Sequence, residues 1–74
     1  METMMQVSIL GRRPIPAGSG TVPTVAMDLH FRENGWTYTE TISVTSDAPE
    51  QEQLDRAARV ILRRNGKRET YDWA

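Results

Sequence analysis

The sequence has no cysteine and only one histidine among its 74 residues. The missing cysteines exclude a disulfide framework and any thiolate metal site, and a single histidine excludes a site that needs two imidazoles. No apolar run approaches the ~20 residues that a transmembrane helix requires. The first residues also lack the basic start and the apolar stretch of a signal peptide. We therefore expect a soluble, cytoplasmic chain without a membrane partner.

An excess of charge of one sign is lacking too. Ten acidic residues nearly balance nine basic ones, and the net charge of -1 indicates no particular partner. The charged and apolar fractions are those of an ordinary soluble globular chain. The length allows one domain, which we place over residues 1–74, near the size at which a core alone is only marginally stabilising. A homodimer or a tightly bound partner is one way for such a domain to gain stability.

The first segment alternates, with Met5, Val7 and Ile9 on one side, and this pattern predicts a short strand over residues 5–10. Residues 12–22 then contain two prolines and two glycines. Because those residues disfavour regular structure, the sequence predicts a flexible loop there. Its glycines do not open a helix, which argues against a phosphate-binding loop.

The strongest pattern in the chain spans residues 24–45. Two alternating runs flank Asn34-Gly35, the preferred pair for a two-residue type I′ hairpin turn. This turn places Met27 opposite Ile42 on an apolar face, and it places threonines on the other face. A shift of one residue would mix the two faces, so the pattern fixes the register.

A helix is predicted after the hairpin. Asp47 can cap it, with Glu50 three residues later as in a capping box, and Asn65-Gly66 is a typical end. Its apolar stripe consists of Leu54, Ala57, Ala58, Ile61 and Leu62. The two small alanines predict a close approach of the helix to a sheet.

The tail, residues 67–74, alternates again and places Tyr71 and Trp73 on one side. The tail either adds a fourth strand, which we favour, or lays its two aromatic side chains over the edge of the core. The fold class is therefore α+β: an antiparallel sheet of three or four strands with one helix packed on its apolar face. The predicted core, with Trp36 and Trp73 at its margins, is Val7, Ile9, Val25, Met27, Leu29, Phe31, Tyr38, Ile42, Val44, Leu54, Ala57, Ala58, Ile61 and Leu62.

Residues that carry catalytic chemistry are scarce. His30 falls on the threonine-rich face, opposite Thr39 and two residues from Asp28, where a surface role is favoured over acid–base chemistry. Nucleophile–base sets, metal-ligand sets and phosphate loops are all missing from the pattern. The sequence predicts that the protein is not an enzyme and uses no cofactor or metal ion.

Glu40 breaks the hairpin pattern, because it is a carboxylate on the apolar face, opposite Leu29. Two explanations are favoured. It is a charge that protects an edge strand from pairing, or it forms an internal ion pair with a basic residue, such as an arginine from the loop or the tail.

Charge is distributed unevenly along the helix, with acids in its first half and bases at its end. The helix dipole accounts for part of this arrangement. A basic patch that binds a partner is the alternative. The partner-binding residues predicted there are Arg56, Arg59, Arg63, Arg64, Lys67 and Arg68, and the polar sheet face adds His30 and Arg32.

A tiny α/β domain with a tight hairpin, a charged helix and no catalytic set resembles the small accessory proteins of bacteriophages and mobile elements, including CRISPR inhibitors. The likeness is one of size and organisation, and it implies a protein that blocks or bridges its target. We predict a non-catalytic module for a protein or nucleoprotein partner. The alternative is nucleic-acid binding through the same arginines, which the balanced charge and the few aromatic residues disfavour.

Overall fold

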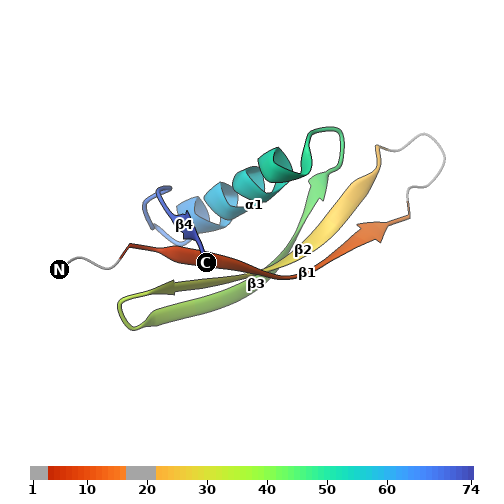
Figure 1. The fold of residues 1–74 in the computed structure, drawn as a ribbon. Helices are drawn as coiled ribbons and strands as arrows, with labels where there is room; N and C mark the ends of the chain where they lie inside the picture. The colour runs from red at the N-terminus through yellow and green to blue at the C-terminus, as the bar shows by residue number, and fades with distance from the viewer. Residues whose placement is uncertain (1–3, 17–21) are drawn as a thin grey trace.

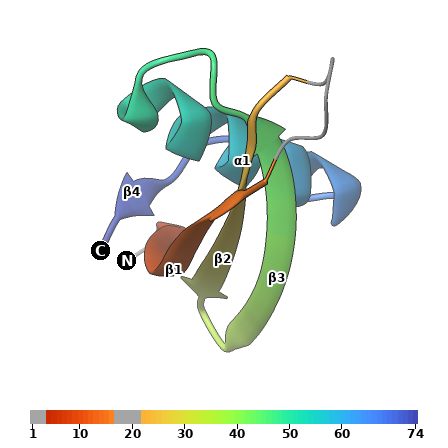
Figure 2. The same ribbon diagram turned by 90° about the vertical axis from the view of Figure 1, so that its right-hand side faces the viewer.

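A computed structural model describes residues 4–16 and 22–74. Its elements, in chain order, are β1 (Gln6–Ile15), β2 (Thr24–Glu33), β3 (Trp36–Thr45), α1 (Glu50–Arg64) and β4 (Asp72–Trp73) (Figure 1). The strands form one sheet in the order β3-β2-β1-β4, and α1 crosses one of its faces (Figure 2). This is the predicted α+β fold. The sheet is mixed rather than wholly antiparallel, because β4 runs parallel to β1.

The hairpin forms in the predicted register along its whole length. Glu33 pairs with Trp36 beside the turn, and Met27 pairs with Ile42 further along. Asn34 and Gly35 have φ angles of 40° and 91°, both positive, as a type I′ turn requires. The turn therefore sets which residues of β2 and β3 face the core.

Gly35→Ala is expected to lower the free energy of unfolding by about 1 kcal/mol or more. A Cβ at this position would meet no atom within 4 Å, so the cost arises from the left-handed backbone and not from a clash. Urea unfolding followed by circular dichroism measures the change, with Thr37→Ala as an exposed control in the same hairpin. An unchanged midpoint would contradict the type I′ assignment.

The flexible loop predicted for residues 12–22 is wrong at its beginning, because β1 continues to Ile15. Along β2, the backbone N–H and C=O groups of successive residues point alternately to β3 and to β1. Because the turn makes Glu33 and Trp36 a hydrogen-bonded pair, the odd-numbered residues bond β3 and the even-numbered residues bond β1. Pro14 lies opposite Val25, an odd position, so the N–H that proline lacks would have pointed away from β2. A proline is tolerated at such an edge position. Residues 17–21 lie outside the described part of the chain.

The core lies between the sheet and α1, and most of the predicted residues occupy it. Ile9 is a correction, since 41% of it is exposed. The reason is that β4 pairs with β1 at Gln6 and Val7, so within the described residues no strand lies beside β1 at Ile9 on its outer side. Met5 is buried instead, at 2%. Trp36 and Trp73 are partly buried and pack against the core margin, as predicted.

The helix begins at Glu50 with Pro49 as its N-cap and without a side-chain cap. The predicted Asp47 cap is therefore wrong. The Asp47 carboxylate instead accepts a hydrogen bond from the Thr45 hydroxyl at 2.9 Å, which draws it away from the helix. Ala57 and Ala58 are fully buried, as the predicted close approach to the sheet requires.

The predicted end of the helix is confirmed. Gly66 has a positive φ of 69°. The N–H of Lys67 donates to the carbonyl of Leu62 at 2.9 Å, and the N–H of Gly66 donates to that of Arg63 at 3.1 Å. This pair of bonds is the Schellman motif, and it directs the chain back toward the sheet.

The tail forms the predicted fourth strand. The N–H groups of Asp72 and Ala74 donate to the carbonyls of Met5 and Val7 at 2.9 and 2.8 Å. Tyr71 and Trp73 pack edge to face, with ring centroids 5.2 Å apart. The described part contains one helix, α1, whose fifteen residues are too few and too polar to cross a bilayer.

Candidate interaction surfaces

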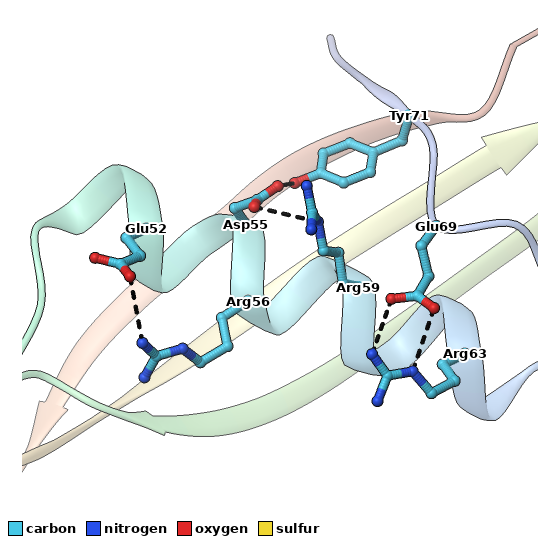
Figure 3. Close-up of polar contacts among 7 residues, drawn as sticks. All are labelled: Glu52, Asp55, Arg56, Arg59, Arg63, Glu69 and Tyr71. Atoms are coloured by element: carbon cyan, nitrogen blue, oxygen red, sulfur yellow. Dashed lines mark hydrogen bonds and ion pairs between the residues drawn. The ribbon is translucent and has the colours of Figure 1, made fainter.

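The exposed face of α1 carries ion pairs between acidic and basic residues (Figure 3). Arg56 lies 3.5 Å from Glu52, and Arg59 lies 3.2 Å from Asp55. Both pairs have the i, i+4 spacing that brings side chains together on a helix surface. Acids of the first half of α1 therefore neutralise the first two predicted arginines.

The last two helix arginines pair with residues outside α1. Arg63 donates two hydrogen bonds to Glu69, at 3.3 and 2.9 Å. These bonds and the nearby positive charge lower the pKa of the Glu69 carboxyl. Arg64 lies 3.3 Å from Glu40. The prediction that Glu40 pairs with an arginine is confirmed, but the arginine comes from the helix, not the loop or the tail.

Lys67 and Arg68 follow the helix and differ from one another. The Lys67 ammonium lies 3.8 Å from Glu33 and 4.5 Å from the centre of the Trp36 ring, a cation–π contact. Among the described residues, no acid lies within ion-pair distance of Arg68. Five of the six predicted basic residues are thus paired within the molecule.

His30 and Arg32 lie on the sheet face that α1 does not cover. His30 Nδ1 is 3.0 Å from Thr39 Oγ1, the neighbour predicted from the hairpin register. Arg32 is exposed and has no acid within ion-pair distance in the described part of the chain. Glu40 projects on the opposite face, so His30 and Glu40 form no common site.

Asp28 organises the middle of the same polar face. Its carboxylate accepts hydrogen bonds from the Thr41 hydroxyl and from Arg13, the latter at 2.8 Å. These bonds lower the pKa of Asp28. Gly11 lies across from it, where an added Cβ would come within 3.1 Å of the carboxylate. The arrangement holds Asp28 ionised and fixes Arg13 against the sheet.

Because the pKa of Asp28 is lowered on folding, the stability that it contributes is present above its unfolded pKa and is lost as pH falls through the folded value. Asp28→Asn should therefore be less stable than the wild type near neutral pH, and the difference should shrink below about pH 4. Urea unfolding at a series of pH values measures it. Thr41→Val and Arg13→Leu each remove one donor and should reproduce part of the effect. A difference that does not depend on pH would contradict this account.

A depression of about 370 Å³ lies between α1 and the C-terminal segment. It is lined by Met4, Asp55, Arg59, Glu69, Thr70, Tyr71, Asp72 and Trp73. The Tyr71 hydroxyl donates to Asp55, and burial together with that bond raises the pKa of the phenol. Within the lining, Asp55 thus pairs with both Tyr71 and Arg59, and Glu69 is held by Arg63 from α1. Among the described residues, no three potential metal ligands gather there or elsewhere.

The large apolar side chains that are most exposed lie in β1 or just before β1 and β2. We call them the β1 rim: Met4, Ile9, Leu10, Ile15 and Val22, which are 38–62% exposed. Three lie in β1, and the other two lie two residues before β1 and β2. Leu10 is the unpaired residue of a bulge between Ile9 and Gly11. The sequence assigned Ile9 to the core and placed Ile15 and Val22 in a loop, so the rim emerges only from the fold.

The predicted partner-binding residues therefore divide into two groups. The six basic residues lie from the middle of α1 to just beyond its end, on the helix side of the sheet, whereas His30 and Arg32 lie on the other side. Comparisons with family models, curated proteins and solved structures give no match for this chain.

Proposed function

We propose that this chain is a non-catalytic binding module that engages a protein partner through the β1 rim and acts by blocking or bridging that partner. One observation carries the proposal: of the five exposed large apolar residues of the described chain, four lie in or just before β1, and the fifth, Val22, lies just before β2, the strand that pairs with β1. Single exposed apolar residues are ordinary, but a gathered set marks an interaction surface. In the part of the chain that the structure describes, the outer edge of β1 also has no neighbouring strand beyond Val7.

The polar sheet face extends this surface. His30 pairs with Ser8 and Arg32 pairs with Gln6, so both predicted binding residues lie on β2, the strand next to β1. An apolar centre bordered by polar groups and arginine is typical of protein interfaces. Arg32 has no acidic neighbour in the described part, and it would suit a carboxylate of the partner.

A protein partner is favoured over nucleic acid because the helix arginines are already paired. Affinity for a phosphate backbone rests on cations that are free to replace counterions. Arg56, Arg59, Arg63 and Arg64 each lie within 3.5 Å of an acid. The resemblance to phage and mobile-element accessory proteins adds the expectation that binding inhibits the partner.

The experiment is an affinity capture from a lysate of the source cells, with and without nuclease. We compare the wild type with Leu10→Asp/Ile15→Asp, which alters the rim, and with Arg59→Glu/Arg63→Glu, which alters the helix face. All four positions are exposed, and circular dichroism verifies that each variant folds.

We expect the wild type to capture a protein partner that resists nuclease treatment. The helix variant should still capture this partner, and the rim variant should not. Loss in the helix variant alone would assign binding to the basic face instead. Recovery of salt-sensitive nucleic acid without any protein would overturn the proposal in favour of the alternative.

A further inference from the structure

The outer edge of β3 is the longest regular edge of the sheet. β3 stands at one end of the strand order and, among the described residues, pairs only with β2, without a register shift along its length. Glu33 and Trp36 close the turn as a hydrogen-bonded pair, so the even residues of β3 bond β2 and the odd residues point their N–H and C=O groups outward. The outward residues are Thr37, Thr39, Thr41, Ser43 and Thr45.

This edge has none of the features that protect the other one. β1 carries a bulge at Leu10, Pro14 and two adjacent arginines, all of which discourage strand pairing. The outward residues of β3 are neutral and include no proline. Glu40, the one charge on the strand, is held by Arg64 at 3.3 Å and accepts a hydrogen bond from the Tyr38 hydroxyl at 2.5 Å.

The apolar side of β3 is also incompletely covered. Tyr38, Ile42 and Val44 are only partly buried, whereas their partners on β2 are 0–2% exposed. Figure 1 shows β3 at the border of the sheet, where a further strand would lie against these side chains. Within the described part of the chain, the outer edge of β3 therefore has no strand to bond, and its apolar side chains are only partly covered.

We propose that β3 pairs antiparallel with β3 of a second copy of this chain, about a two-fold axis at Thr41. This register places Thr41 opposite Thr41 of the second copy, Thr39 opposite its Ser43, and Thr37 opposite its Thr45. Each of these is a hydrogen-bonded pair that exchanges two backbone bonds. Every outward N–H and C=O of the strand is then satisfied, because the strand is complementary to itself about this residue.

The side chains fit a second copy equally well. On the helix side, Tyr38 would meet Val44 of the second copy, and Glu40 would meet its Ile42, so no like charges stand directly opposite one another. The two Glu40 carboxylates become diagonal neighbours, about 7–8 Å apart between Cα atoms, and each keeps its own Arg64 at 3.3 Å. On the polar side the two Asp28 carboxylates stand about 15 Å apart, three strand spacings, beyond the Debye length at physiological salt. Two-fold dimers are also the commonest assembly of soluble proteins.

The dimer does not depend on the function proposed above, because it uses the opposite edge of the sheet from the β1 rim. It would place one rim at each end of a continuous sheet. Two linked sites on one particle raise avidity and can join two partner molecules.

The first test is sedimentation velocity over a range of protein concentrations, with Ser43→Pro and Ser43→Ala as a matched pair. The Ser43 N–H points outward, so proline leaves the pairing with β2 intact and blocks the pairing with a second copy. We expect the wild type and Ser43→Ala to dimerise alike, and Ser43→Pro to raise the dimer dissociation constant at least about tenfold. Wild-type protein that stays monomeric up to millimolar concentration overturns the proposal, as does equal dimerisation of Ser43→Pro.

The second test uses the absence of native cysteine. Thr41→Cys places two thiols across the axis, where hydrogen-bonded partners have Cα atoms about 5.5 Å apart, within the range of a disulfide. Thr37→Cys is the control, because its two copies stand eight residues apart, about 27 Å. Mild oxidation should link Thr41→Cys alone. Equal linking of both variants, or a dimer lost in Leu10→Asp and kept in Ser43→Pro, would place the contact elsewhere. Partner capture by the rim should survive Ser43→Pro, which separates the two proposals.

Discussion

Replacing Phe31 with alanine is expected to lower the free energy of unfolding by about 3–5 kcal/mol. A domain of this length has only about 4–11 kcal/mol of stability in all. Phe31 is fully buried in the central strand, between Val7 on β1 and Tyr38 on β3, with the two aromatic rings 6.5 Å apart. Both neighbouring strands are hydrogen-bonded to β2 and cannot move into the cavity that alanine would leave. Most of the lost packing energy is therefore not regained.

Urea unfolding measures this loss, and Ile9→Ala is the matched control. The sequence pattern assigns Phe31 and Ile9 to the same core, but Ile9 is 41% exposed. Ile9→Ala should therefore cost about 1 kcal/mol, in proportion to the smaller area removed from water. If Phe31→Ala does not fold, Phe31→Leu keeps the comparison possible. Equal costs at the two positions would contradict the described position of β1.

The hairpin could be predicted residue by residue because its signals are local. Asn34-Gly35 specifies the turn, and the alternation on both sides leaves one register that separates apolar from polar residues. The helix end was predictable for the same reason, since Gly66 supplies a backbone conformation that few other residues adopt.

The path of β1 could not be predicted, because its prolines are unfavourable in most strands and acceptable in this one. The backbone nitrogen of Pro14 points to the outer side of β1, where β4 would have to lie for a hydrogen bond to be lost. β4 pairs with β1 at Gln6 and Val7, far from Pro14, so the proline costs no bond there. Because β4 does not reach Ile9, that side chain is exposed as well. A local pattern contains no information about pairing with β4, whose residues Asp72 and Trp73 lie 66 positions after their partners Gln6 and Val7.

The contacts on the candidate surfaces also fall into local ones, which the sequence predicts, and contacts between distant elements, which it does not. Pairing of Arg56 with Glu52 follows from spacing on one helix, and the sequence contains that information. Pairing of Arg64 with Glu40 requires knowledge of where α1 crosses the sheet. Counting bases near the helix end therefore overestimates the free positive charge. The β1 rim was missed because its residues were divided between a predicted core and a predicted loop.

The contact between α1 and the sheet leads to the second large effect. Ala58 is fully buried where the helix packs on the strands, with Ala57 buried beside it. Ala58→Leu adds three carbon atoms to a close-packed contact and is expected to cost about 1–3 kcal/mol by forcing the helix outward or the side chain into a strained rotamer. Leucine is nearly as good a helix former as alanine, so helix propensity does not account for a loss of this size.

Gln51→Leu is the control for Ala58→Leu, because it introduces the same side chain at an exposed position of the same helix. Urea unfolding should show a loss only at position 58. The outward shift should also separate Arg64 from Glu40, now 3.3 Å apart. Glu40→Gln should then cost less in the Ala58→Leu background than in the wild type, a non-additivity expected of coupled sites. Additive costs, or equal losses at positions 51 and 58, would show that α1 does not approach the sheet closely at Ala58.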